Sequence, residues 1–116
     1  MRLSVMVLSD PGITRAGTLA LRLLSMAQHQ GYQLDTAFFY HNGAYAAVNP
    51  RAAAQRASWT QLSRASGLMC IVCQTALARI GASSTTLPQA WRLGGLGDWL
   101  AACERSDRVL QFGSFR

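Results

Sequence analysis

Lysine is absent from this 116-residue sequence and acidic residues are few, so eleven arginines face only five aspartates and glutamates and the net charge at pH 7 is +6. Long apolar runs are also absent. The longest, near residues 3–8, is far shorter than the roughly 20 residues that cross a bilayer. It is also too short for the apolar part of a secretory signal. We therefore expect a cytoplasmic protein with no membrane association.

The arginines are spread along the chain without forming a run. Nucleic-acid binding gains free energy when clustered cations release counterions from phosphates, and the sequence shows no such cluster. Solvated faces, or docking on an acidic protein, are therefore favoured over a nucleic-acid site, which stays open as the alternative.

Other common kinds of site are also poorly represented. Zinc needs about four ligands at suitable spacing, and three cysteines with His29 and His41 offer no second ligand pair. The sequence has neither the G-x-S-x-G elbow of serine hydrolases nor the G-x-x-x-x-G-K-[ST] loop of phosphate-binding proteins. We therefore expect no bound metal and no organic cofactor.

Strand-like and helix-like segments alternate along the whole chain. Short apolar or aromatic runs predict strands, and apolar residues at three- and four-residue spacing predict amphipathic helices. Asn49 and Pro50 are typical of a helix start, and Gly31 and Gly67 are typical of helix ends. The predicted strands cover residues 3–8, 34–40, 68–72, 90–93 and 108–112, and the predicted helices cover residues 13–27, 50–65, 74–80 and 98–105.

This alternation predicts an α/β fold, because short apolar strands joined by helices require right-handed parallel crossovers. We expect three layers, α/β/α, around a mostly parallel five-stranded sheet. With 50% apolar and 14% charged residues and no linker, residues 1–116 are expected to form a single domain. In such sheets functional groups collect beyond the carboxyl ends of the strands, where loops lead into helices.

Two cysteines near the third predicted strand have the spacing C-x-x-C. In an extended strand this spacing separates the Cα atoms by roughly 10 Å and sends the side chains to opposite faces, so a disulfide between Cys70 and Cys73 is disfavoured. Cys70 is expected to be a buried packing residue. Cys73 is expected at the carboxyl edge of the sheet and the start of a helix, in reach of solvent and in a setting that favours a thiolate. The alternative, a second buried packing cysteine, is disfavoured because this edge is the functional end of such a sheet. Cys103, within the last predicted helix, is expected in the core.

A histidine and a glycine-rich segment also lie near the predicted carboxyl edge of the sheet. His41 follows the second strand beside Asn42-Gly43, which predicts a turn; a surface histidine is favoured over one that reaches the thiol. The segment Gly94-Gly95-Leu96-Gly97 is favoured as a tight turn before a helix over a cradle for an anion.

Four segments in order resemble the DsrE/TusD sulfurtransferases. They are Phe38-Phe39-Tyr40-His41-Asn42-Gly43; Trp59 with Leu62 and Gly67; Cys73 opening a short helix closed by Gly81; and residues 93–97 through 107–112. The similarity covers nearly the whole chain and is closest to the TusD branch. Cys73 matches the sulfur-carrying cysteine of the family, whereas Cys70 is outside the family's pattern. The segment between Gly81 and Trp91 is shorter and less acidic than is usual there.

The resemblance implies a DsrE-like fold and a sulfur-relay enzyme, in which Cys73 is the catalytic residue. Such a protein takes persulfide sulfur from a TusA-like donor and passes it to a TusE-like acceptor, for 2-thiouridine synthesis in tRNA or, in the DsrE branch, for sulfur oxidation. It implies assembly with two related subunits in a heterohexamer, with a homo-oligomer open as the alternative. Contact with RNA is expected only through downstream proteins. A non-catalytic assembly subunit and a basic RNA-binding module are the rival hypotheses.

Overall fold

A computed structural model describes residues 1–115, and Arg116 lies outside the described residues. Its centre is a five-stranded sheet with all strand pairs parallel, in the order β4-β3-β2-β1-β5. The predicted α/β class and five-stranded parallel sheet are therefore confirmed. The strands are β1 (Arg2–Val7), β2 (Gln33–Phe39), β3 (Met69–Cys73), β4 (Trp91–Gly94) and β5 (Arg108–Phe112).

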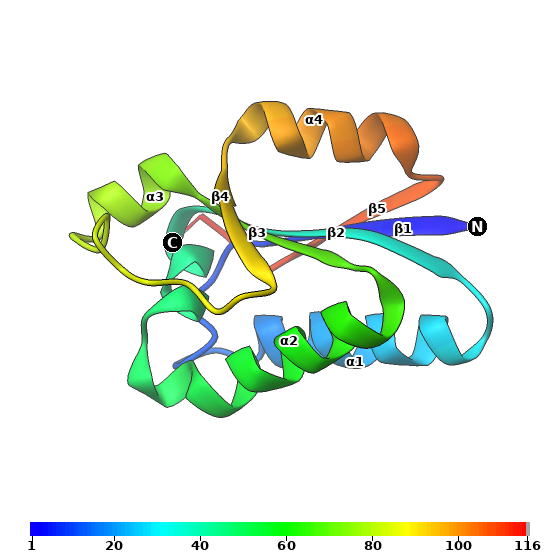
Figure 1. Ribbon diagram of the computed structural model, residues 1–116, viewed down its shortest axis with the longest axis horizontal. Coiled ribbons are helices and arrows are strands. Elements are labelled where there is room, and N and C mark those ends of the chain that lie inside the picture. The colour runs from blue at the N-terminus through cyan, green and yellow to red at the C-terminus, as the bar shows by residue number, and fades with distance from the viewer. Residues whose placement is uncertain (116) are drawn as a thin grey trace.

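Helices cover the sheet on both faces (Figure 1). The helices α1 (Ala16–His29) and α2 (Ala53–Ser66) lie side by side on one face, and α4 (Leu96–Arg105) lies on the other. The short α3 (Gln74–Arg79) and the 3-10 helices η1 (His41–Ala47) and η2 (Pro50–Ala52) gather at the carboxyl end of the sheet. No helix within residues 1–115 is long and apolar enough to cross a membrane.

Three predicted elements differ from the structure in detail. Ile13 was expected on the apolar face of the first helix, but it lies in the preceding turn and is exposed, because residues 11–15 form successive turns that begin at Asp10. The expected turn at Asn42-Gly43 is instead the start of η1. Pro50 opens a 3-10 turn before the α-helix, although Asn49 caps it as predicted by accepting a hydrogen bond from the N–H of Arg51 at 2.9 Å.

The two faces of the sheet are packed by different aromatic groups. Phe39 projects toward α2, where its ring is 5.2 Å from that of Trp59 and 4.7 Å from that of Trp91. Phe38, its neighbour in β2, projects toward α4 and stacks on Trp99 at 6.0 Å. Because successive strand residues point to opposite faces, this pair defines which face each residue of the neighbouring strands occupies.

The carboxyl ends of β1 and β2 are held together by the backbone where β2 leads into η1. The N–H of Tyr40 donates to the Val7 carbonyl at 3.0 Å, and the N–H of Gly43 donates to the Leu8 carbonyl at 3.1 Å. Gly43 lies so close to β1 that an added Cβ would collide with the Val7 carbonyl oxygen. Glycine is therefore required here for close approach of two backbones, and this approach fixes the position of Tyr40 and His41.

The opposite end of the sheet is fixed by an ionic cluster under α4. Asp35 of β2 is buried, and its carboxylate accepts hydrogen bonds from Arg105 Nη2 at 2.8 Å and from Thr36 Oγ1 at 2.7 Å. Arg2 lies 3.6 Å away on the same carboxylate. Burial works to raise the pKa of Asp35, but the bonds from Arg105 and Thr36 and the charges of Arg105 and Arg2 outweigh it, so the pKa is lower than usual.

Candidate active site

Cys73 is the last residue of β3, one residue beyond the predicted end of the strand, and it caps α3. It therefore lies at the boundary between strand and helix that the sequence predicted. Its backbone is still extended, with φ −67° and ψ 121°, and α3 begins with the next residue. Cys73 therefore lies at the carboxyl end of β3, an interior strand of the sheet. Parallel α/β folds place their functional groups at these strand ends. The side chain of Cys73 forms no hydrogen bond that caps the helix.

Cys70 and Cys73 are both free thiols and project from opposite faces of β3. Cys70 faces α2, where its Sγ lies 3.9 Å from the carbonyl oxygen of Trp59 and the residue is fully buried. Burial raises the pKa of the Cys70 thiol to about 12, so this thiol stays protonated at neutral pH. The predicted packing role of Cys70 fits this environment. Cys103, expected in the core, is instead only partly buried on α4.

Cys73 faces the α4 side and lines a cavity of about 310 Å³ between η1, α3 and the start of α4. The expectation that this thiol would be openly exposed was wrong, since Cys73 is only 3% exposed. It lies at the base of a recess, because Tyr40, Thr75 and Leu96 rise around it. Thr75 and Leu96 are themselves exposed, so the cavity reaches the surface beside them.

The charged and titratable lining of this cavity is basic. It includes Arg79 and His41 and, among the described lining residues, no aspartate or glutamate. The Arg79 Nη2 atom donates a hydrogen bond to Asn42 Oδ1 at 2.9 Å, which ties the guanidinium on α3 to η1 across the cavity. A cation at a partly enclosed site whose lining holds no carboxylate favours an anion such as a thiolate or a persulfide anion.

His41 was expected at the surface, apart from the thiol, and the structure places it in the cavity lining. Its backbone has φ 54°, a conformation uncommon outside glycine, and it is the only described non-glycine residue with positive φ. Its ring lies 5.4 Å from that of Phe115 near the carboxyl terminus. Strain of this kind turns the chain sharply after β2 and brings the imidazole back over the strand ends.

Among the polar lining residues, sequence reasoning singled out neither Arg79 nor Thr75, and it named Tyr40 only within a segment that resembles the family. One signal could have found Arg79. Arg79 lies six residues after Cys73, in a predicted helix of less than two turns. Such a short helix keeps every side chain on it close to the cysteine at its start. Tyr40 follows directly on a buried strand, so it also had to lie at the carboxyl edge.

The tight turn favoured from the sequence for Gly94-Gly95-Leu96-Gly97 is not what the structure has: Gly94 ends β4, Gly95 is a single extended residue, and Leu96 and Gly97 already belong to α4. Gly95 is the residue before the helix, and its N–H donates to the Asp98 carboxylate at 2.9 Å. This hydrogen bond is the main reason that the pKa of Asp98 is lowered. Because the Asp98 carboxylate already accepts from the start of α4, this helix start is unsuited to an anion. Nowhere in the described residues do three or more His, Cys, Asp or Glu side chains group as a metal site would require.

The sequence of this chain is similar to those of known proteins. The sequence profile of the DsrE/DsrF-like family matches residues 1–112, almost the whole chain. The chain belongs to this family. The resemblance stated from the sequence is thereby confirmed.

Two relatives of this DsrE/DsrF-like protein extend the comparison. A Pseudomonas aeruginosa protein named "Sulfurtransferase TusD homolog" is 30% identical over an alignment of 125 residues, which covers 94% of this chain and 95% of the relative. The crystal structure of the ychN protein from E. coli superposes with a TM-score of 0.74, covering 97% of this chain and all of that chain. At 17% identity the second comparison supports the fold alone.

Proposed function

We propose that this DsrE/DsrF-like protein is a sulfurtransferase that carries persulfide sulfur on Cys73. The observation that carries the proposal is the position of this thiol: it lies at the carboxyl edge of the sheet, in a recess lined by Arg79 and His41 and by no carboxylate. The name of the P. aeruginosa relative supports sulfur transfer as the general activity.

The reaction needs only the side chains and two partner thiols. The Cys73 thiolate attacks the outer sulfur of a donor persulfide, R–S–SH. The new S–S bond forms on Cys73 as the donor's S–S bond breaks, and the donor leaves as a thiolate. Attack by an acceptor thiolate on the outer sulfur of Cys73–S–SH reverses these roles and restores the Cys73 thiolate. The sulfur moves formally as HS⁺: Cys73 supplies the electron pair of the new S–S bond and the donor keeps the pair of the broken one, so no external oxidant or reductant takes part.

Arg79 and His41 have distinct parts in this proposal. The Arg79 guanidinium, held by Asn42, lies where it can offset the negative charge that moves between the sulfurs. The imidazole of His41 lies on the same cavity, where it can donate a hydrogen bond to the departing thiolate. Because Cys73 is only 3% exposed, we infer that the donor and acceptor cysteines reach it on segments narrow enough to enter this cavity.

The partners follow from the same proposal. We infer a TusA-like donor and a TusE-like acceptor, with the sulfur used for 2-thiouridine synthesis in tRNA in the cytoplasm, and assembly of the single domain with two related subunits. Use of the same chemistry in sulfur oxidation is the alternative destination. Neither pathway alters what is expected of Cys73.

One observation favours a second candidate, a non-catalytic assembly subunit. Cys73 is only 3% exposed, which is unusual for a thiol that must meet another protein. In that case Cys73 would be inert, and its rate of alkylation would stay low from pH 6 to pH 9. The relay proposal instead expects small alkylating agents to enter the recess and modify Cys73 faster as the thiolate fraction rises.

Mass spectrometry of the intact protein tests the proposal. The fully reduced protein is incubated with a low-molecular-mass persulfide, and one sulfur atom adds about 32 Da. We expect this adduct in the wild type, in Cys70→Ser and in Cys103→Ser, and its loss in Cys73→Ser. An adduct that survives Cys73→Ser, or that never forms on the wild type, would overturn the assignment.

A further inference from the structure

The fold gathers arginines that are scattered in the sequence. Among residues 1–115, the side chains of four arginines make no hydrogen bond and no ion pair, whereas every other described arginine side chain has a partner. All four lie on the layer formed by α1 and α2 or at its start. They are Arg15, Arg22, Arg51 and Arg64.

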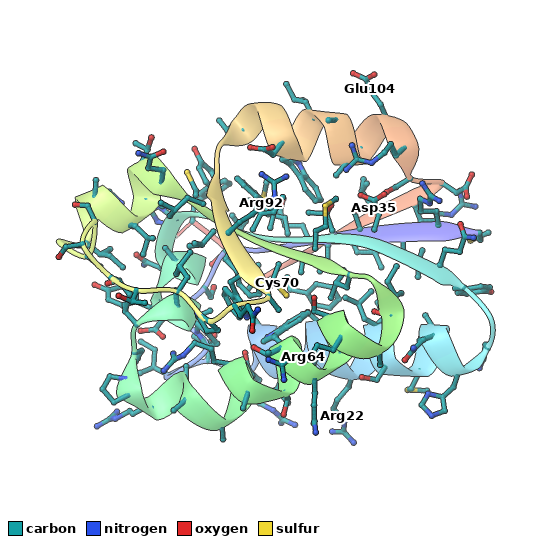
Figure 2. All side chains as sticks on the ribbon, in the orientation of Figure 1. Arg22, Asp35, Arg64, Cys70, Arg92 and Glu104 are labelled. Atoms are coloured by element: carbon teal, nitrogen blue, oxygen red, sulfur yellow. The ribbon has the colours of Figure 1, made fainter. Side chains whose placement is uncertain are left out.

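The helices of this layer carry no acidic side chains of their own to balance these charges. The helices α1, η2 and α2 contain no aspartate or glutamate. Of the five acidic residues, Asp35 is buried beneath α4, Asp98 and Glu104 belong to α4 itself, and Asp107 follows it. Asp10 lies before α1, and its carboxylate accepts hydrogen bonds from the Gly12 N–H and the Asn49 amide. Figure 2 shows the contrast: Arg22 points outward from the α1 and α2 layer, Arg64 lies over α2, and Glu104 points outward from α4 on the other side of the sheet.

A groove runs between these two helices. They are parallel neighbours, joined by hydrogen bonds from Gln55 Nε2 to Thr18 Oγ1 at 3.0 Å and from Gln28 Nε2 to the Ala65 carbonyl at 3.4 Å. The ten residues between these ties span about 15 Å of helix. The groove has a volume of about 730 Å³, and a second depression of about 510 Å³ adjoins it, since both are lined by Ser58 and Gln61.

The lining combines an apolar floor with basic edges. Leu21, Leu62 and Met26 contribute apolar surface, and Met26 is 63% exposed. Arg22 lines the groove from α1, and Arg64 lines the adjoining depression from α2. Arginine and methionine are enriched at protein interfaces, whereas lysine, aspartate and glutamate are depleted there, which is the composition of this face.

We propose that the α1/α2 groove is a docking site for an acidic amphipathic helix of a partner protein. Its apolar stripe would cover Leu21, Met26 and Leu62, and its carboxylates would pair with Arg22 and Arg64. A second copy of this chain is disfavoured because it presents the same uncompensated positive charge. A nucleic-acid backbone would pair with the arginines but would leave the apolar floor unused. This surface is separate from the Cys73 cavity, so the inference does not depend on the proposed function.

Fluorescence anisotropy with a defined peptide tests the inference. The probe is a labelled, stapled helix of about four turns, with leucines along one face and glutamates on both flanks. A scrambled peptide of the same composition and poly(U) RNA serve as competitors. We expect saturable binding to the wild-type protein and to Cys73→Ser, with little competition from either.

Variants of the protein separate the contribution of the arginines from that of the apolar floor. Arg22→Gln with Arg64→Gln is expected to weaken binding of the peptide about tenfold or more. The control, Arg92→Gln with Arg79→Gln, removes the same net charge from β4 and α3, outside the groove, and should change affinity by less than about twofold. Met26→Gln should also weaken binding, because the peptide uses the apolar floor.

Four results would overturn the inference. They are the absence of saturable binding at about 1 mM peptide, equal losses in the two arginine pairs, competition by poly(U) with no effect of Met26→Gln, and self-association of the protein that the Arg22→Gln, Arg64→Gln pair abolishes. The third result would assign the face to nucleic acid, and the fourth would assign it to a second copy of the chain.

Discussion

Asp35→Asn should detach the end of α4 from the sheet without altering the shape of the side chain. The Asp35 carboxylate holds Arg105, the last residue of α4, through the Nη2 contact at 2.8 Å and an Nε contact at 3.0 Å. An amide keeps the size of the group but loses its charge, and its NH2 group cannot accept from Arg105. The helix C-terminus and the turn into β5 would then lose their main polar attachment to β2.

The magnitude follows from how deeply each partner is buried. Removing one partner of a fully buried ion pair costs about 3 to 5 kcal/mol, because the other charge is left without solvent. Here the Asp35 side chain is 7% exposed, but the side chains of Arg105 and Arg2 are each 40% exposed and can regain water. We therefore expect a loss of about 2 kcal/mol in the free energy of unfolding, which lowers Tm by about 8 °C for a chain of this length.

The loss should depend on pH in a defined direction. The pKa of Asp35 is lower in the folded protein than in the unfolded chain, where it is about 3.9. Its stabilising contribution is therefore complete above the unfolded pKa and disappears as pH falls through the lower folded pKa. The stability difference between wild type and Asp35→Asn should be full at pH 7 and should shrink markedly by about pH 3.

Urea unfolding followed by circular dichroism at pH 7, 5 and 3 measures this difference. Glu104→Gln is the matched control, because it removes one negative charge from a side chain that projects from α4 into solvent (Figure 2). We expect the control to lie within about 0.5 kcal/mol of the wild type. Equal stability of Asp35→Asn and Glu104→Gln at pH 7, or a difference that does not shrink at low pH, would refute the reasoning.

Three further predictions use other positions. Cys70 is buried and its pKa is raised to about 12, so it should resist iodoacetamide in the native protein at pH 8 and react only on unfolding. Peptide mapping measures this, and modification of the native protein would contradict the burial. Gly43→Ala should cost about 1 to 3 kcal/mol in thermal unfolding, because its Cβ meets the β1 backbone, whereas Gly97→Ala, with open space around it, should cost nothing. Asp98→Ala should cost about 1 kcal/mol through loss of the Gly95 cap, and an unchanged Tm would argue against that role.

Much of the fold could be predicted from the sequence because local signals agree with the global arrangement. The buried strands are short and nearly continuous in apolar character, and the order of strands and helices leaves few ways to connect them. β5 was predicted with its observed bounds, and Asn49 and Gly67 mark the ends of the second helical segment as expected. The start of α1 was missed, since Ile13 continues the apolar spacing although turns hold it outside the helix.

The candidate site was only partly predictable for a physical reason. Cys73 could be placed at the sheet edge because its position depends on where one strand ends, which is a local property. Its burial depends on η1 and on the start of α4, which approach it from distant parts of the sequence. His41 reaches the cavity only through a positive φ, and no local pattern predicts that conformation for a histidine. The sequence also did not predict the arginines of the α1/α2 groove. Arg22 and Arg64 lie on different helices and come onto one face only when α1 and α2 pack.

The two cysteines of β3 lie in different environments because successive side chains of a strand point to opposite faces of the sheet. Cys70 points toward α2 and is sealed by it, whereas Cys73 points to the other face and opens on a cavity. Because the α1/α2 groove lies on the face of the sheet that Cys73 does not use, a protein docked there would leave the cavity free. A relay needs a donor and an acceptor to reach one sulfur in turn. A partner retained on α1 and α2 could therefore stay bound while other thiols exchange at Cys73, which gives the basic face a use independent of the chemistry.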